Sequence, residues 1–255
     1  MSVFYKRLFK FPMLQQKIFP GDLFFFLKEK PHFSNSNATA SEDKKGSTFI
    51  DAVCSSAVAE SLTIESKINH QVFHVGLFIN ETTIIHATTF HGVIKETIMN
   101  AIISTKPSIV EIYRIQCSDE QRQKAVKFAY SSLGAKYNDI FSPNCINSAG
   151  QKSYYCCQFI CEAYGRDMFN PHRLNFMENG KILEYWIKYF DERNEPIPQG
   201  LPGSHPSILK SSKCLNLIKL FNISKELEIS EEEINNKSNS NLNTDLPYIC
   251  KQSHL

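Results

Sequence analysis

Between residues 72 and 115 the chain carries four short β-rich segments, and this run constrains the fold more than any other feature. The segments cover residues 72–79, 82–88, 92–97 and 109–115. Short polar turns separate the first three, so these are expected to pair as antiparallel neighbours. A fifth segment, residues 23–28, follows the turn signal Pro20-Gly21-Asp22. The sequence therefore predicts an antiparallel sheet of five or six strands.

Four other segments have the apolar spacing of helices. They cover residues 48–62, residues 118–133, a stretch that starts near Tyr155, and residues 181–190. The second opens with a capping box from Ser118 to Gln121, and Gly134 ends it. The third has a stripe that begins at Cys156 and continues at i+3, i+4, i+7 and i+8. We predict an α+β fold in which a curled antiparallel sheet packs against the helix that carries Cys156.

Composition divides the chain into one domain with two flanking segments. We predict an N-terminal extension at residues 1–17, a domain at 18–221 with an exposed insertion loop at 31–47, and a tail at 222–255. The tail is rich in Asn and Ser and has three Lys against five Glu and one Asp, which gives it a net charge of −3. Such a segment is expected to be disordered. It is interpreted as a binding segment for a partner or for export machinery, or as an inert solubilising tail.

Charge and hydropathy exclude several classes of protein. The 28 Lys and Arg against 26 Asp and Glu give a formal net charge of +2, which argues against nucleic-acid binding as the main activity. No apolar run approaches the length of a transmembrane helix, and no signal peptide is expected. We expect a protein that is cytoplasmic at synthesis, with secretion as an effector by a non-Sec route left open. No Cys-x2-Cys pair of zinc spacing occurs.

Cys156 is the thiol best placed for chemistry. A Cys in the first turn of a helix has its thiolate stabilised by the helix dipole and by unpaired backbone N–H groups, which also offer an oxyanion site. Cys157 and Cys161 share another face of the helix and are interpreted as small buried residues. Taken alone, Cys156 is also compatible with a role as a core thiol.

The predicted sheet offers a base for this thiol. Alternation places His74 on the same face as Gly76 in the strand 72–79, and His86 lies in the next strand. A three-residue loop at residues 79–81 puts the two His directly opposite, and a loop at 80–82 leaves them diagonal at about 7 Å. In either register one imidazole can orient the other. A two-residue turn at Asn80-Glu81 places them on opposite faces, where each is a core histidine.

The remaining histidines near these segments are assigned no role. His70, His91, His172 and His205 lie in turn-like contexts and are expected to be solvent exposed. The number of histidines at His70, His74, His86 and His91 raises the question of a metal site. Strand spacing does not bring four imidazoles to one point, so we expect no metal and no cofactor.

Several sequence phrases resemble a known family. PGDLFFFLK, FHVGLFI and TIIHATTFHGVI resemble the GDL, HVGI and IHA…GV strands of the NlpC-type papain-like cysteine peptidases. In those enzymes the nucleophilic Cys precedes the His, whereas here YYCCQFICEAY follows it. This order resembles the circularly permuted YiiX/YebB-like cysteine hydrolases, a papain-clan family also found in poxviruses. The resemblance covers about residues 18–220 and implies a circularly permuted papain-like (NlpC-type) fold.

The resemblance also implies roles for three residues. Cys156 corresponds to the nucleophile, His74 to the general base and His86 to the third position. Two departures from the permuted family are visible. Its third position is often Glu rather than His, and its nucleophile is followed by Ser-Glu, where this chain has Cys157-Gln158.

The expected activity is a thiol hydrolase that cleaves an amide bond in a peptide or peptidoglycan-like substrate through a Cys acyl-thioester. Two alternatives stay open. One is a lipid acyltransferase or thioesterase of the permuted papain-like type, which would take a lipid acyl substrate. The other is a catalytically inert binding module.

Overall fold

The computed structural model describes residues 17–29, 49–54, 70–169 and 172–223. The predicted insertion loop, nearly all of the N-terminal extension and of the tail, and the second half of the predicted helix 48–62 lie outside these residues. Within them, residues 49–54 are helical. The helices in this part of the chain are all too short or too polar to cross a membrane.

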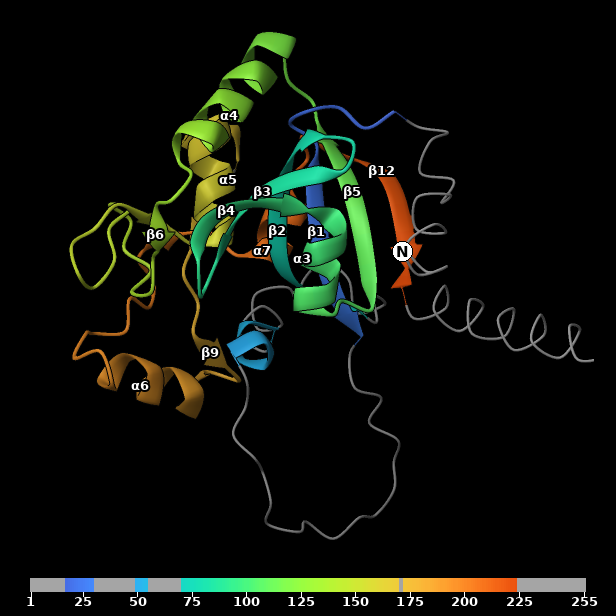
Figure 1. The fold of residues 1–255 in the computed structure, drawn as a ribbon. Coiled ribbons are helices and arrows are strands. Elements are labelled where there is room, and N and C mark those ends of the chain that lie inside the picture. The colour runs from blue at the N-terminus through green and yellow to red at the C-terminus, as the bar shows by residue number, and fades with distance from the viewer. Residues whose placement is uncertain (1–16, 30–48, 55–69, 170–171, 224–255) are drawn as a thin grey trace, which may run out of the picture.

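A six-stranded antiparallel sheet forms the centre of the fold (Figure 1). Its strands, in spatial order, are β12 (Leu215–Asn222), β5 (Ile109–Ile115), β1 (Leu23–Glu29), β2 (His70–Asn80), β3 (Thr83–Thr88) and β4 (Gly92–Thr97). The five predicted strands are confirmed. The sixth, β12, is an edge strand with mostly half-exposed or exposed side chains, so it lacks the apolar run of a central strand. It ends at Asn222, and the next residue, Ile223, is buried.

The sheet separates two apolar cores, which explains four consecutive large apolar residues in β1. Leu23 and Phe25 pack on the face that is covered by three helices, α4 (Asp119–Ser131), α5 (Cys156–Tyr164) and α7 (Pro206–Lys210). Phe24 and Phe26 pack on the opposite face, against α3 (Ile98–Thr105). A strand that is buried on both faces reads as a continuous apolar run. Helix α3 is not among the predicted helices, although Thr97 caps its start by accepting a hydrogen bond from the Asn100 N–H.

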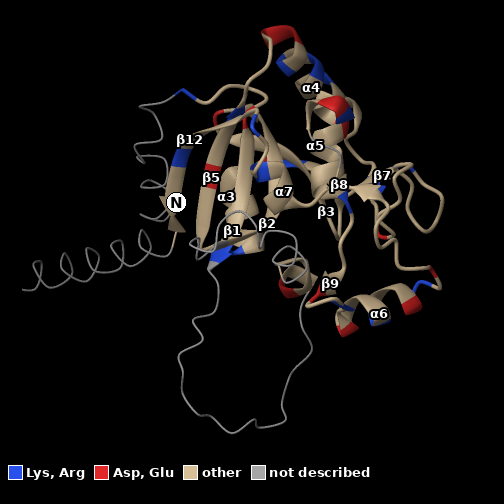
Figure 2. Cartoon of the chain, turned by 180° about the vertical axis from the view of Figure 1, so that it is seen from behind, with Lys and Arg blue, Asp and Glu red and all other residues tan. Residues whose placement is uncertain are grey.

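Two of the predicted helices occur close to their expected bounds. Helix α4 (Asp119–Ser131) has the predicted capping box, and α5 is Cys156–Tyr164. Helix α6 (Glu184–Asp191) starts three residues later than predicted, because Lys181–Ile182 (β10) pairs with Met177–Glu178 (β9). The hairpin turns through Asn179 and Gly180, both with positive φ, and Asn-Gly is the preferred sequence for such a turn. Basic and acidic side chains are mixed along α4 and α6 (Figure 2).

Short elements set the start of α5. The parallel pair β6 (Lys136–Tyr137) and β7 (Ser153–Tyr154) ends two residues before Cys156. After α5 come the 3-10 helix η2 (Arg166–Met168), the pair β8 (His172–Arg173) and β11 (Pro202–Gly203), and α7 (Pro206–Lys210). Tyr155 links the start of α5 to the segment between β11 and α7, because its hydroxyl accepts a hydrogen bond from the Ser204 N–H at 3.1 Å.

Candidate active site

Cys156 is the first residue of α5, as the sequence predicts, and only 8% of its surface is exposed. The N-cap residue, Tyr155, has extended backbone and provides no side-chain hydrogen bond to the first turn. The N–H groups of that turn are therefore left without the usual cap, as a helix N-terminus that binds an anion requires. This geometry suits an oxyanion on a carbonyl group that the Cys156 sulfur attacks.

The loop before β7 is held by two buried side-chain amides, those of Asn138 and Gln158, beside the first turn of α5. Asn138 is fully buried and donates from Nδ2 to Gln158 Oε1 and to the Ser142 carbonyl, each at 2.8 Å. Gln158 in turn donates to the same carbonyl. Gln158, which stands where the family pattern has Glu, thus holds the loop in place against α5.

His74 and His86 lie on the same face of the sheet and are in contact. The β2–β3 register pairs Leu77 with Ile85, so His86 is diagonal to His74, as in the second predicted register. Both His86 and Ile84 lie beside Gly76, where an added Cβ would be 3.3 Å from the His86 Cβ and 3.0 Å from Ile84 Cδ1. His74 Nε2 and His86 Nδ1 are 2.8 Å apart. The absent side chain at Gly76 thus leaves room for His86.

Glu96 in β4 completes the chain of polar groups and was not predicted. Its Oε1 lies 2.7 Å from His86 Nε2. The β3–β4 register pairs His86 with Ile94, so Glu96 is the next residue on the same face. The sequence signal was the short turn at residues 89–91, which sets this register and makes His86 and Glu96 diagonal neighbours.

The order of these contacts determines the tautomers. A carboxylate only accepts hydrogen bonds, so His86 donates from Nε2 to Glu96 and its Nδ1 is an acceptor. His74 must then donate from Nε2 to His86 Nδ1. Burial lowers the pKa of His86, although its hydrogen bond to Glu96 acts in the opposite direction. The lowered pKa favours the neutral form of this ring. The ring nitrogen of His74 that remains for Cys156 is therefore Nδ1.

The two adjacent thiols differ in their acidity. Their sulfurs are 3.8 Å apart. The pKa of Cys156 is lowered well below its usual value by a hydrogen bond from Cys157 and by the neighbouring His74, which together outweigh desolvation. Burial and the Cys156 charge raise the pKa of Cys157. Cys156 is therefore the more acidic of the two thiols, and Cys157 donates to its sulfur.

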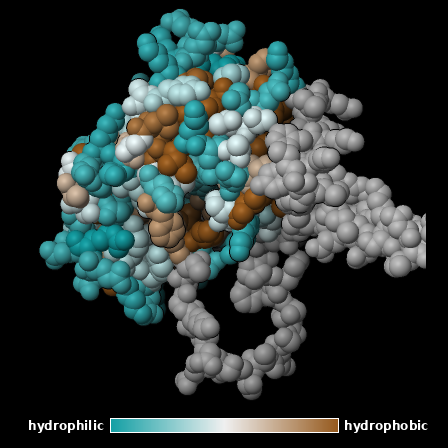
Figure 3. Space-filling view, in the orientation of Figure 1, coloured by the Kyte–Doolittle hydropathy of each residue, from teal (hydrophilic) through white to brown (hydrophobic). Residues whose placement is uncertain are grey.

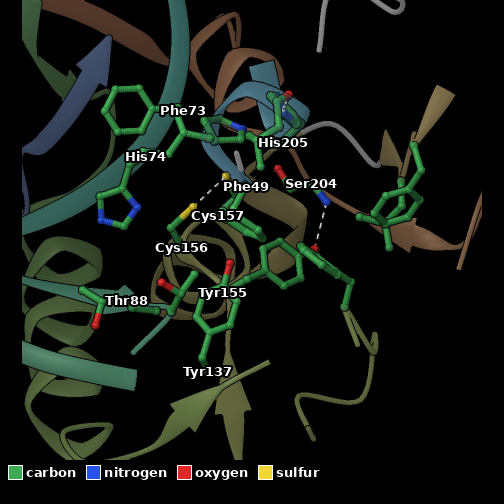
Figure 4. Close-up of a pocket in the computed structure, with 18 of the residues that line it drawn as sticks. Phe49, Phe73, His74, Thr88, Tyr137, Tyr155, Cys156, Cys157, Ser204 and His205 are labelled. Carbon is green, nitrogen blue, oxygen red and sulfur yellow. Dashed lines mark hydrogen bonds between the residues drawn. The ribbon is translucent and has the colours of Figure 1, made fainter. Parts of the chain in front are cut away.

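A cavity of about 150 Å³ adjoins Cys156 and His74 (Figure 4). His205 lies in its wall, contrary to the expectation of a solvated residue. His205 Nε2 donates to the Val53 carbonyl at 2.9 Å, and Nδ1 accepts from the Ser207 N–H, which caps α7. Burial lowers the pKa of His205 to about 4. Of the other three, His91 is exposed as expected, and His172 is only partly exposed. The side chain of His70 lies outside the described part of the chain.

The described part of the chain holds no set of side chains that could ligate a metal ion. No group of three or more His, Cys, Asp or Glu side chains there could hold a metal ion. Both nitrogens of His86 and both of His205 are engaged by protein groups. The donors beside Cys156 therefore do not fit a metal centre.

The comparisons with known proteins agree with this architecture. No curated protein matches the sequence significantly. A solved structure, described as that of metalloprotein yiiX from Escherichia coli O157:H7, is 16% identical with a TM-score of 0.52 and covers 80% of this chain and 98% of its own. At this identity the likeness shows the fold alone. Residues 47–199 match the model of the family described as permuted papain-like amidase enzyme, YaeF/YiiX, C92 family. The chain therefore belongs to the permuted papain-like amidase family.

Proposed function

We propose that this chain is a thiol amidase in which Cys156 is the nucleophile, His74 the general base, and His86 and Glu96 orient that base. The observation that carries the proposal is the hydrogen-bonded line of His74, His86 and Glu96 that ends at a low-pKa thiol on a helix N-terminus. A nucleophile, a base and an orienting group are the parts that covalent acyl transfer needs. A catalytically inert module would not require this alignment.

In the proposed first step, His74 Nδ1 takes the Cys156 thiol proton and the sulfur attacks the carbonyl carbon of the amide. The carbonyl π pair moves to oxygen, where the uncapped N–H groups of the first α5 turn stabilise the charge. The oxyanion then reforms the carbonyl as the C–N bond breaks, and His74 gives its proton to the leaving nitrogen. The products of this step are the free amine and an acyl-thioester on Cys156.

In the second step, His74 Nδ1 removes a proton from water, and the hydroxide oxygen attacks the thioester carbonyl. The C–S bond breaks, the carboxylic acid leaves, and Cys156 regains its proton from His74. The described residues fit no metal site, and neither step uses one. The imidazolium formed in each step keeps its Nε2–H bond to His86, which is itself held by Glu96.

The proposal is tested by trapping the intermediate. The full-length protein is mixed with p-nitrophenyl hexanoate and quenched in acid during the first turnover, and fragmentation mass spectrometry then locates the adduct. We expect one hexanoyl group on Cys156, and slower release of p-nitroaniline from the matching anilide. Cys156→Ala is expected to lose both. Acylation at another residue, or an unchanged burst in Cys156→Ala, would contradict the proposal.

The contact between His86 and Glu96 predicts an effect of Glu96→Gln. The amide nitrogen of Gln can donate to His86 Nε2, which reverses the hydrogen-bond order and leaves His74 Nδ1 protonated. We expect the rate of Cys156 alkylation by iodoacetamide at pH 6 to fall about tenfold, as for an orienting group rather than the base itself. The measurement is the pH profile of this rate between pH 5 and 9, together with Tm.

Glu81→Gln is the matched control, because Glu81 is exposed in the β2–β3 turn. It removes the same charge without touching the histidines and is expected to leave the profile unchanged. Glu96→Asp, which restores a carboxylate, is expected to recover part of the rate. An unchanged pH profile in Glu96→Gln, or the same change in Glu81→Gln, would remove the orienting role.

A further inference from the structure

The cavity beside Cys156 has a wall of buried aromatic rings. Tyr155, which precedes the nucleophile, packs on Phe141 with ring centroids 5.2 Å apart. Phe141 contacts Phe176 at 5.5 Å and Trp186 at 5.7 Å, and Phe176 contacts Trp186 at 5.1 Å. All four rings line the cavity and are 8% exposed or less. The wall therefore extends without a break from α5 to α6.

The rest of the lining carries no formal charge. None of the described residues that line the cavity is Lys, Arg, Asp or Glu. The amide of Asn175 is occupied by bonds to the chain itself, and Tyr155 OH is occupied by Ser204. A substrate group with a carboxylate or an ammonium would find no ion-pair partner in this lining and would have to lose its water. An apolar group would not incur that cost.

The size of the cavity limits the apolar group. A dry apolar cavity of about 150 Å³ accepts a molecule of the size of benzene. The cavity here has that volume and opens to solvent, so its lined part accommodates about six carbon atoms, and a longer chain would extend beyond the lining. In Figure 3 apolar surface gathers on the side of the molecule near α3 and the helix at residues 49–54, which both contribute lining residues.

We infer that this cavity is the acyl site of the proposed amidase and that it selects short apolar acyl groups, such as an unbranched chain of about six carbons or a benzoyl group. The inference rests on the proposed function of Cys156. The leaving amine must depart and water must enter, so the aromatic wall suits the part of the substrate that stays on the sulfur. Peptidoglycan-like acyl groups with charged side chains are disfavoured by the same lining.

The test uses alkyl methanethiosulfonates: the thiolate attacks the sulfur that carries the alkyl chain, a mixed disulfide forms, and methanesulfinate leaves, without any hydrolytic step. The rate of modification of Cys156 in the full-length protein is measured site by site for the methyl, butyl, hexyl and decyl reagents, each relative to glutathione. We expect the relative rate to rise at least tenfold from methyl to hexyl and to fall from hexyl to decyl. Phe176→Ala, which lengthens the cavity, is expected to make decyl at least as fast as hexyl.

Phe190→Ala is the matched control, because Phe190 is equally buried against Trp186 but does not line the cavity. It is expected to keep the chain-length profile of the unmodified sequence. Equal relative rates for all four reagents, or a maximum at decyl, would overturn the acyl-site inference and leave the nucleophile in place. Failure of Cys156 to react with any reagent would instead overturn the proposed function.

Discussion

Replacing His74 with alanine is expected to lower the rate of Cys156 acylation by a factor of about 10³ to 10⁴, because the thiol then has no base. His74 is the group in the described structure whose hydrogen bond and charge reach Cys156 from the sheet. Its loss also removes the acid for the leaving nitrogen, so amides should suffer more than activated esters. Stopped-flow release of p-nitrophenol and of p-nitroaniline from the same acyl group measures both effects.

The order of severity between the two histidines is part of this prediction. His86→Ala is expected to leave measurable activity, because His86 touches His74 and not the sulfur. His91→Ala, at an exposed position in the β3–β4 turn, is the control and should be unchanged. If His86→Ala proves more damaging than His74→Ala, the base has been assigned to the wrong ring.

His205 is expected to make the protein sensitive to acid. Its pKa is lowered from 6.5 to about 4 by burial, so the unfolded chain binds a proton at a higher pH than the folded one. The stability contributed by neutral His205 is fully present above about pH 6.5 and is lost as the pH falls toward and through 4. The loss from this residue amounts to roughly 3 kcal/mol. Protonation at Nδ1 removes the acceptor that caps Ser207 N–H.

His205→Asn tests this prediction, because Asn can cap α7 and does not titrate. The free energy of unfolding, measured by urea titration at pH 7, 6, 5 and 4, should fall less steeply with acid in the variant. His86, whose pKa is also lowered by burial, keeps some slope in both proteins. His91→Asn is the control for removal of an exposed imidazole. Parallel profiles for His205→Asn and the unmodified chain would contradict the assignment.

Local pattern predicted the elements that hold the site, but not all of its chemistry. The stripe that starts at Cys156 gave the helix and its first residue, and alternation gave the shared face of His74 and Gly76. The β2–β3 register stayed open, because the strand pair has an irregularity between Phe78 and Asn80 that shifts the pairing by one residue. Turn length alone does not determine such a shift.

Other features depended on contacts between distant parts of the chain. The role of His205 requires α7 to pack beside the helix at residues 49–54, since its partner is the Val53 carbonyl. The short elements of β8 and β11 have two residues each and no periodicity to detect. By contrast, Glu96 and the Asn179-Gly180 hairpin had local signals. The signals are the short turn at residues 89–91, which makes Glu96 a diagonal neighbour of His86, and the Asn-Gly pair that precedes α6.

Alkylation mapped by mass spectrometry shows directly whether Cys156 is the activated thiol of this chain. Burial raises the pKa of Cys54 to about 12, of Cys161 to about 12 and of Cys145 to about 11, whereas the pKa of Cys156 is lowered. The full-length protein is treated with a limiting amount of iodoacetamide at pH 6. We expect Cys156 to be labelled well before every other cysteine. Labelling of Cys156 no faster than Cys157 or Cys145, or none at Cys156, would contradict it.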